Sequence, residues 1–170
     1  VAPSMVIVKN RDSAYNWIVM HTSLSTDNNL FLSQTNAAGA ISTISNGGIS
    51  TTTSSTTFTC KQGTTNTANV NESTKNLVAY CFAAVAGYSA FGSYTGNGSA
   101  DGPFVFCGFR PRFVLFKRTD SSTSGEWVIF DSARSVNNAA QNRLYPNLSD
   151  RKSTRLNSSH IPLSRMPSSA

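Results

Sequence analysis

The chain contains two copies of one sequence pattern, and this repetition limits its fold more than any other feature. Residues 3–21 read PSMVIVKNRDSAYNWIVMH, and residues 111–131 read PRFVLFKRTDSSTSGEWVIFD. The copies are offset by 108 residues up to a central turn, in which the second copy has two additional residues. A weaker similarity follows each copy, between NNLFLS at 28–33 and NRLYPNLS at 142–149. A repeat of this length predicts domain-sized units rather than a short-period solenoid.

Each copy has the pattern of a β-hairpin. An apolar run, at residues 5–9 or 113–117, precedes a polar turn and a second strand that begins with a tryptophan. Asp and Ser favour the turn because their side chains bond nearby backbone amides. Trp17 and Trp127 recur at one hairpin position, as core anchors would, and Lys9 recurs with Asp12 as a predicted turn pair.

The remaining pattern is also typical of β-structure. Short β-branched and aromatic bursts alternate with clusters of Ser, Thr, Asn and Gly. Residues 77–87 (LVAYCFAAVAG) could form a buried helix, but the β-formers among them favour a strand. Residues 45–57 are of low complexity and are expected to form a flexible loop or an edge hairpin. Further strands are expected at 30–32, 40–45, 57–61, 77–85, 89–94 and 104–107.

These strands predict an all-β, antiparallel β-sandwich as the repeat unit. We expect a first unit at residues 1–108 and the truncated start of a second unit at residues 109–149. The second unit then lacks the strands that would follow its first hairpin.

The last segment, residues 150–170, is predicted to be a non-biological tail. Residues 150–160 (DRKSTRLNSSH) are similar, residue by residue, to the translation of a common short-read sequencing adapter. Residues 164–170 (SRMPSSA) match its continuation beyond a variable index. A natural basic, Ser-rich disordered tail would share this composition but not the ordered match. We therefore give this segment no weight in arguments about function.

Charge argues against a nucleic-acid partner, and the length of the apolar runs argues against a membrane partner. Four of the 14 Lys and Arg residues and one of the 8 Asp and Glu residues lie in 150–170, so the net charge of +6 falls to +3 for residues 1–149. The remaining bases form no run, and we expect no nucleic-acid partner. No apolar run approaches the length of a membrane span, and no membrane partner is expected.

Three cysteines, Cys60, Cys81 and Cys107, are too few and too widely spaced for a CxxC metal or redox motif. Buried free thiols are the predicted state. A disulfide between Cys81 and Cys107 is the alternative, and it would require an oxidising compartment.

No group of residues specifies a reaction. His21 is the single histidine of residues 1–149, and its repeat partner is Asp131, which favours a surface position at a strand end over an essential base. Glu72 and Glu126 lie in different turns and form no carboxylate pair. We predict no catalytic residue, no metal site and no cofactor, and therefore a protein that is not an enzyme.

Two features could bind a ligand. Asn97 and Asp101 in GNGSADGP could offer oxygens to a cation, but the spacing is not that of a calcium loop, and a tight turn is favoured. Tyr88 and Tyr94, with Phe91 between them, could stack on a sugar or fill a core. The candidate ligand-binding residues are Tyr88, Tyr94, Asn97 and Asp101.

Three motifs carry a family resemblance: GYSAFGSYTGNG at residues 87–98, DGPFVFCGFRP at 101–111 and KRTDS at 117–121. With them, residues 1–149 resemble a repeat of uncharacterised phage virion and tail-fibre-like proteins, most strongly over 78–134. The resemblance implies a jelly-roll or lectin-like sandwich, assembly in the cytoplasm of a bacterial host and location in the virion. It supplies no catalytic residue.

The resemblance also implies a function. We expect a non-enzymatic structural protein, a tail-fibre or appendage repeat that displays contacts to the host surface. Its implied partners are other virion proteins and host surface glycans, and a homotrimer is compatible with this class. The alternatives are a carbohydrate-binding module of a phage depolymerase and a repeat of a bacterial surface adhesin.

Overall fold

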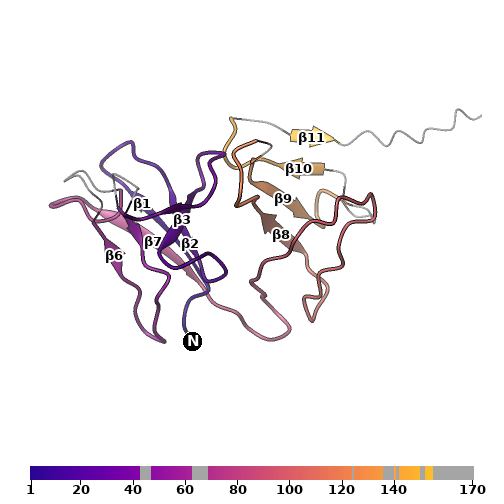
Figure 1. Cartoon of the computed structure of the whole chain (residues 1–170), viewed down its shortest axis with the longest axis horizontal. Helices are drawn as coiled ribbons and strands as arrows, with labels where there is room; N and C mark the ends of the chain where they lie inside the picture. Colours follow the sequence, from indigo (N-terminus) through magenta and orange to yellow (C-terminus); the bar gives the residue numbers. More distant parts are fainter. Residues whose placement is uncertain are drawn as a thin grey trace, which may run out of the picture.

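The computed structural model describes residues 1–42, 47–62, 69–123, 125–135, 140, 142–149 and 152–154. Within these ranges the chain forms strands and no helix, and every strand pair is antiparallel. The predicted all-β fold with antiparallel sheets is confirmed. Figure 1 shows two groups of strands, one from each half of the chain.

The first sheet has the strand order β4-β3-β2-β1-β7. Its members are β1 (Met5–Asn10), β2 (Ile18–His21), β3 (Asn28–Phe31), β4 (Gly39–Ala40) and β7 (Leu77–Phe82). The three strands from β1 to β3 are joined by short turns, whereas β7 comes from far along the chain to pair with β1. β1 is therefore a central strand with a neighbour on each side.

The second sheet has the order β11-β10-β9-β8. It consists of β8 (Phe113–Phe116), β9 (Val128–Asp131), β10 (Asn142–Leu144) and β11 (Lys152–Thr154). β11 belongs to the segment predicted to be an adapter-derived tail. Its backbone pairs with β10. This pairing does not test whether the segment derives from an adapter.

One core lies between the first sheet and a short ribbon of β5 (Gly48–Ile49) and β6 (Cys60–Lys61). Alternate residues of a strand point to opposite faces of its sheet, so every second residue of β1 faces this ribbon. β5 lies in the region expected to be a flexible loop or an edge hairpin, and β6 lies in the strand expected at residues 57–61. The two strands pair antiparallel. The buried residues of this first core are Val6, Val8, Ile18, Met20, Ile49 and Val70.

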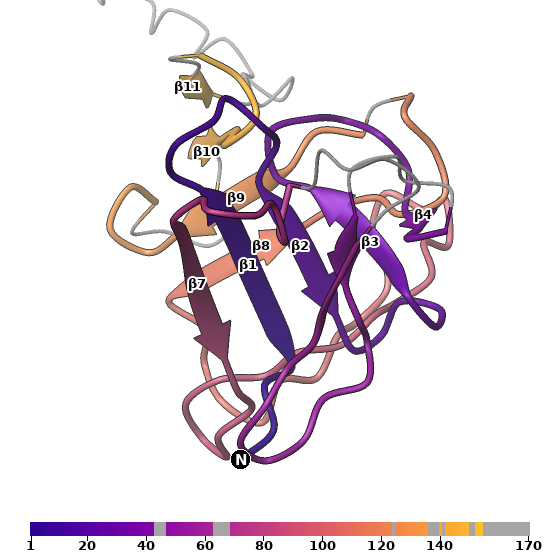
Figure 2. The same ribbon diagram turned by 90° about the vertical axis from the view of Figure 1, so that its left-hand side faces the viewer.

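A second core lies on the opposite face of the first sheet. Ile7, Val19 and Leu30 pack there against Trp127, which directly precedes β9 of the second sheet and is 4% exposed. Figure 2 shows β8 and β9 behind β1 and β2, so the two sheets form layers. The first sheet is thus covered on both faces, which explains the nearly continuous apolar run of β1.

The two hairpins pair in the same way. Met5 lies opposite His21 in β1–β2, and the corresponding residues Phe113 and Asp131 lie opposite each other in β8–β9. The third strands agree as well, since the pair Val19–Leu30 corresponds to the pair Ile129–Leu144. The sequence similarity therefore coincides with an equivalent register over three strands.

Some predicted strands are wrong. Residues 89–94 and 104–107 form no strand, and this region contributes only an isolated bridge between Val85 and Ser89. Residues 77–82 do form a strand rather than a helix, but it ends before the predicted boundary at 85. Part of the strand expected at 40–45 lies outside the described residues. β-forming side chains predict a strand only where a partner strand is available.

No element in the described part of the chain is a helix with the length and apolar character of a membrane span.

Candidate functional site

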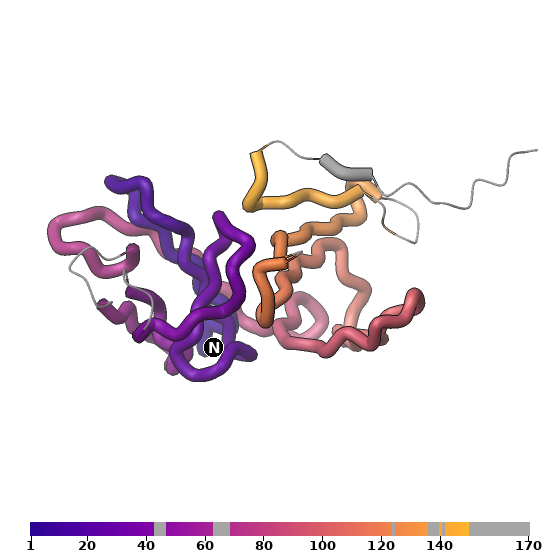
Figure 3. The backbone as a smooth tube through the Cα atoms, turned by 45° about the horizontal axis from the view of Figure 1, so that its top comes forward, coloured from indigo at the N-terminus to yellow at the C-terminus, as the bar shows by residue number. Residues whose placement is uncertain are grey.

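The segment at residues 83–112, between β7 and β8, carries the most exposed aromatic side chains of the described chain. Phe104 is 91% exposed, Phe106 is 82% exposed and Tyr88 is 81% exposed. The segment runs along the periphery of the molecule from the first sheet to the second (Figures 1 and 3). Two of the three resemblance motifs lie within it, so those motifs describe a surface rather than a core.

Tyr88 is presented by a tight turn. The backbone N–H groups of Tyr88 and Ser89 donate to the Val85 carbonyl at 3.0 and 2.9 Å, and the Ser89 hydroxyl donates to the Ala83 carbonyl at 2.7 Å. Gly87 has a φ of 73°, a conformation that glycine adopts without steric cost. The turn holds the Tyr88 ring away from the sheets and leaves it free to contact another molecule.

Asn97 and Asp101 lie in a second turn of the same segment. The Asn97 side-chain oxygen accepts the Ser99 N–H at 3.0 Å, and the Gly102 N–H donates to the Ser99 carbonyl at 3.1 Å. Gly98 and Gly102 both have positive φ, at 69° and 63°. The geometry matches the predicted tight turn, because the amide oxygen that could ligate a cation already caps the backbone. The described residues contain no group of three His, Cys, Asp or Glu side chains suited to hold a metal.

The four predicted ligand-binding residues do not form one site in the described part of the chain. No hydrogen bond or ring contact joins Tyr88 or Tyr94 to the turn at Asn97 and Asp101. Tyr94 is 55% exposed, so both tyrosines are accessible for stacking, whereas Phe91 between them is half-buried. The ring of Phe91 lies against an imidazole of the first sheet and not toward the tyrosines.

That imidazole belongs to His21. Its ring centroid lies 6.1 Å from that of Phe91, and its Nδ1 accepts the Ser23 N–H at 3.0 Å. The side chain is half-buried rather than a free surface group, and burial lowers its pKa below the usual value of 6.5. An Nδ1 that accepts a hydrogen bond belongs to the neutral imidazole, which agrees with the direction of this shift.

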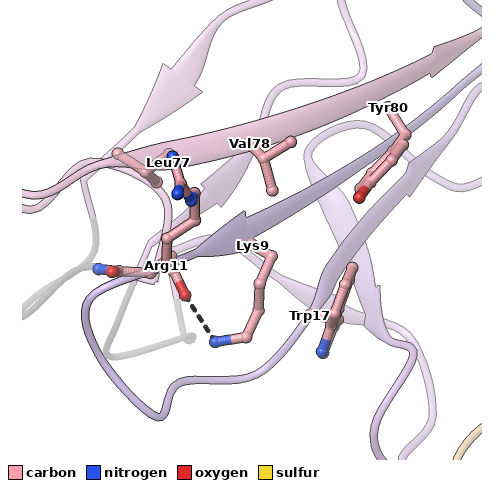
Figure 4. A pocket seen from close by; sticks show the side chains of 7 residues that line it. Lys9, Arg11, Trp17, Leu77, Val78 and Tyr80 are labelled. Atoms are coloured by element: carbon pink, nitrogen blue, oxygen red, sulfur yellow. Dashed lines mark hydrogen bonds between the residues drawn. The ribbon is translucent and has the colours of Figure 1, made fainter.

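A surface hollow on the first sheet was not predicted from the sequence. Its volume is about 570 Å³, and it lies at the end of β1 next to the turn toward β2 (Figure 4). Trp17 and Tyr80 stack against each other on its wall, with ring centroids 6.3 Å apart and an angle of 24° between the planes. Two cationic side chains, one amide side chain and two residues at the start of β7 complete the lining: Lys9, Arg11, Asn10, Leu77 and Val78.

Sequence reasoning could not find this hollow, because it depends on the pairing of β7 with β1. Ile7 lies opposite Tyr80 in that pair, which brings the tyrosine to the same face of the sheet as Trp17. Trp17 was predicted to be a core anchor like Trp127, but it is only half-buried. Trp127 is buried against the first sheet, whereas Trp17 lies at the edge of the hollow.

The predicted pair of Lys9 and Asp12 does not form. The Lys9 ammonium donates to the carbonyls of Asn10 and Ser13, at 2.7 and 2.9 Å, and the first of these bonds is drawn in Figure 4. The Asp12 carboxylate instead accepts the backbone and side-chain N–H groups of Asn76, and the backbone bond is the main reason for its lowered pKa. The lysine therefore closes the hairpin turn, and the aspartate ties that turn to the start of β7.

All three cysteines are free, as predicted, and no disulfide joins Cys81 to Cys107. The expectation that they are buried is wrong: Cys60 and Cys107 are half-buried, and Cys81 is exposed on the edge strand β7. Cys60 packs against the first core, and burial raises the pKa of its thiol. A thiol with a raised pKa is a weak nucleophile at neutral pH.

The fold and surface define an all-β domain of layered antiparallel sheets that displays aromatic side chains on a peripheral segment. The chain belongs to the family described as "Domain of unknown function (DUF7483)", whose model matches residues 1–164. The matched range spans both sheets and part of residues 150–170. No curated protein and no solved structure matches the chain.

Proposed function

We propose that this protein is a non-enzymatic structural component of a phage virion, a tail-fibre or appendage repeat whose peripheral segment contacts the host surface. The observation that carries the proposal is the exposure of Tyr88, Phe104 and Phe106 within the motifs that resemble virion repeats. Contiguous exposed apolar surface marks interaction sites, and Phe104 and Phe106 lie two positions apart in the sequence. The partners proposed are other virion proteins and a host surface glycan, and a trimer would multiply weak contacts.

The cores lie in the sheets and the exposed aromatic side chains lie in the peripheral segment, and this separation supports the proposed role. The two cores hold the sheets together, while residues 83–112 use backbone turns and contribute no residue to either core. Loops on a rigid scaffold can present contact residues without a cost to the fold. Aromatic side chains contribute large contact areas with little loss of side-chain entropy.

A carbohydrate-binding module is a second candidate, and the hollow is the specific observation in its favour. Sugar rings stack on aromatic faces, and the adjoining Trp17 and Tyr80 offer such a face. Arg11 on the rim would add a donor for an acidic sugar.

Binding to a panel of bacterial cells and to a glycan array separates the two candidates. Under the virion proposal, the double variant Phe104→Ser/Phe106→Ser loses cell binding, and Tyr80→Ala retains it. The carbohydrate-binding candidate requires the reverse, with glycan binding lost in Tyr80→Ala. Circular dichroism of each variant provides the folding control. Cell binding that survives substitution of Tyr88, Phe104 and Phe106 together would exclude the peripheral segment as the contact surface.

A further inference from the structure

β8 forms one edge of the second sheet. The strand order is β11-β10-β9-β8, and no other strand of the described chain pairs with β8 on its outer side. Phe113 and Val114 at this edge are 58% and 39% exposed. An edge strand with apolar side chains and unpaired backbone groups is a site for the addition of another strand.

The first sheet shows what occupies the equivalent position. β1 pairs with β2 in the register that β8 has with β9, but β1 has β7 on its other side. Met5 is half-buried, whereas its counterpart Phe113 is exposed. Val114 is exposed as well, but its counterpart Val6 is buried in the core against the β5–β6 ribbon. The two edges therefore differ by one strand.

The hydrogen bonds between β8 and β9 show which backbone groups of β8 point to the open edge. Ser4 and Thr22 bond across β1–β2 at 2.9 Å, and the equivalent residues Arg112 and Ser132 bond across β8–β9 at the same distance. Successive residues of an antiparallel strand bond to opposite neighbours. The N–H and C=O groups of Phe113 and Leu115 consequently point to the open edge, while those of Val114 and Phe116 point to β9.

We propose that the open edge of β8 binds an antiparallel strand of β7 type, supplied by a second copy of the repeat unit. In the first sheet, Phe82 lies opposite Met5 and Tyr80 lies opposite Ile7. The added strand therefore places its phenylalanine opposite Phe113 and its tyrosine opposite Leu115. Strand addition takes its affinity from main-chain hydrogen bonds and its selectivity from alternate side chains. This inference does not depend on the virion role.

The test uses a synthetic peptide with the sequence of residues 75–83 (KNLVAYCFA), carrying Cys81→Ser to prevent disulfide formation, added to the full chain labelled with 15N. At a peptide concentration about ten times its Kd, we expect amide exchange at Phe113 and Leu115 to slow about tenfold. Exchange at Val114 and Phe116 should not change, because β9 already protects these amides.

Two controls make the experiment decisive. A peptide with Tyr80→Pro lacks a central donor and should not slow exchange. The protein variant Phe113→Pro loses an edge-directed N–H but keeps the bonds to β9, so it should fold and bind the peptide at least about tenfold more weakly. The proposal is overturned by unchanged Phe113 and Leu115 exchange in folded protein, or by slowing at the outer edge of β7 instead.

Discussion

Among single residues, Asn29 connects the first sheet to the β5–β6 ribbon. Its side chain is fully buried, accepts the Ile49 N–H at 2.6 Å and donates to the Ile49 carbonyl at 2.8 Å. The amide group thus satisfies backbone groups of β5 in the way that a neighbouring strand would. A Cβ on the adjacent Gly48 would lie 2.2 Å from the Asn29 oxygen, so the close approach requires glycine.

Replacing Asn29 with alanine should lower the free energy of unfolding by about 3 kcal/mol, because a buried N–H and a buried C=O lose their partners. Asn28→Ala is the matched control, since the half-buried Asn28 side chain makes no such bonds in the described chain, and its effect should stay below about 1 kcal/mol. Urea denaturation measures both values. Equal effects would mean that the bonds to Ile49 contribute nothing beyond packing.

His21 should make stability depend on pH. Because burial lowers its folded-state pKa, the folded state resists protonation more than the unfolded state does. Its contribution to stability is therefore present above the unfolded value of about 6.5 and is lost as the pH falls toward the folded pKa. Thermal denaturation between pH 7.5 and 5 should show a fall in Tm that is absent in His21→Gln. An identical fall in both proteins would assign the effect to other groups.

At the scale of elements, the turn before β9 fits closely against the loop after β3. A Cβ on Gly125 would lie 2.3 Å from the carbonyl oxygen of Thr35 and 2.9 Å from those of Ser121 and Ser122. Backbone atoms cannot yield as a flexible side chain does. The hydrogen bond from the Ala38 N–H to the Thr119 carbonyl, at 2.8 Å, anchors the same contact.

Gly125→Ala should therefore destabilise the protein by about 2 kcal/mol, as overpacking does. Gly92→Ala is the control, because a Cβ there meets no atom within 4 Å and the residue does not have a positive φ. Its effect should remain within about 0.5 kcal/mol. Chemical denaturation of the two variants decides the matter, and a Gly125→Ala protein as stable as the control would refute the close contact.

The pairing of elements also shows where sequence reasoning succeeded. Both hairpins were predicted because a hairpin is local: its alternation, its turn residues and its tryptophan lie within about 20 residues. The strands expected at 89–94 and 104–107 had the right composition, but the fold gives them no partner. The hollow beside Trp17 likewise depends on β7, which reaches β1 only through a long connection.

For the whole molecule, Trp127 is the main link between the sheets. Its ring is buried against Ile7, Val19 and Leu30, and its Nε1 donates to the Phe31 carbonyl at 2.8 Å. Most of this contact joins residues more than 90 positions apart in the sequence. Its loss should separate the layers.

Trp127→Ala should reduce the free energy of unfolding by about 4 kcal/mol, within the range for buried tryptophan. Trp17→Ala, at the equivalent but half-buried position, should cost less than half as much. Equilibrium denaturation followed by circular dichroism tests the comparison. Equal losses of unfolding free energy would show that the buried Trp127 stabilises the fold no more than the half-buried Trp17 does.

Residues 150–170 should be dispensable for the fold. Neither core contains a described residue beyond Trp127, and β11 pairs with β10 through three residues at the sheet edge. Removing the segment should change the free energy of unfolding by less than about 0.5 kcal/mol. A larger loss would give these residues a structural role that an adapter-derived tail would not have.

The sequence by itself determined the all-β class, the two hairpins and the turn at residues 96–103, because each depends on neighbouring residues and on the conformational preferences of Asp, Asn and Gly. The tertiary structure alone decided which tryptophan is buried, which cysteine is exposed and which aromatic side chains face solvent. Burial is set by pairing and layering between distant segments, and the free energy of those contacts belongs to the assembled sheets. The open edge of β8 is also a feature of the tertiary structure. The pairing of β7 with β1 is the observation from which we infer a strand beside β8.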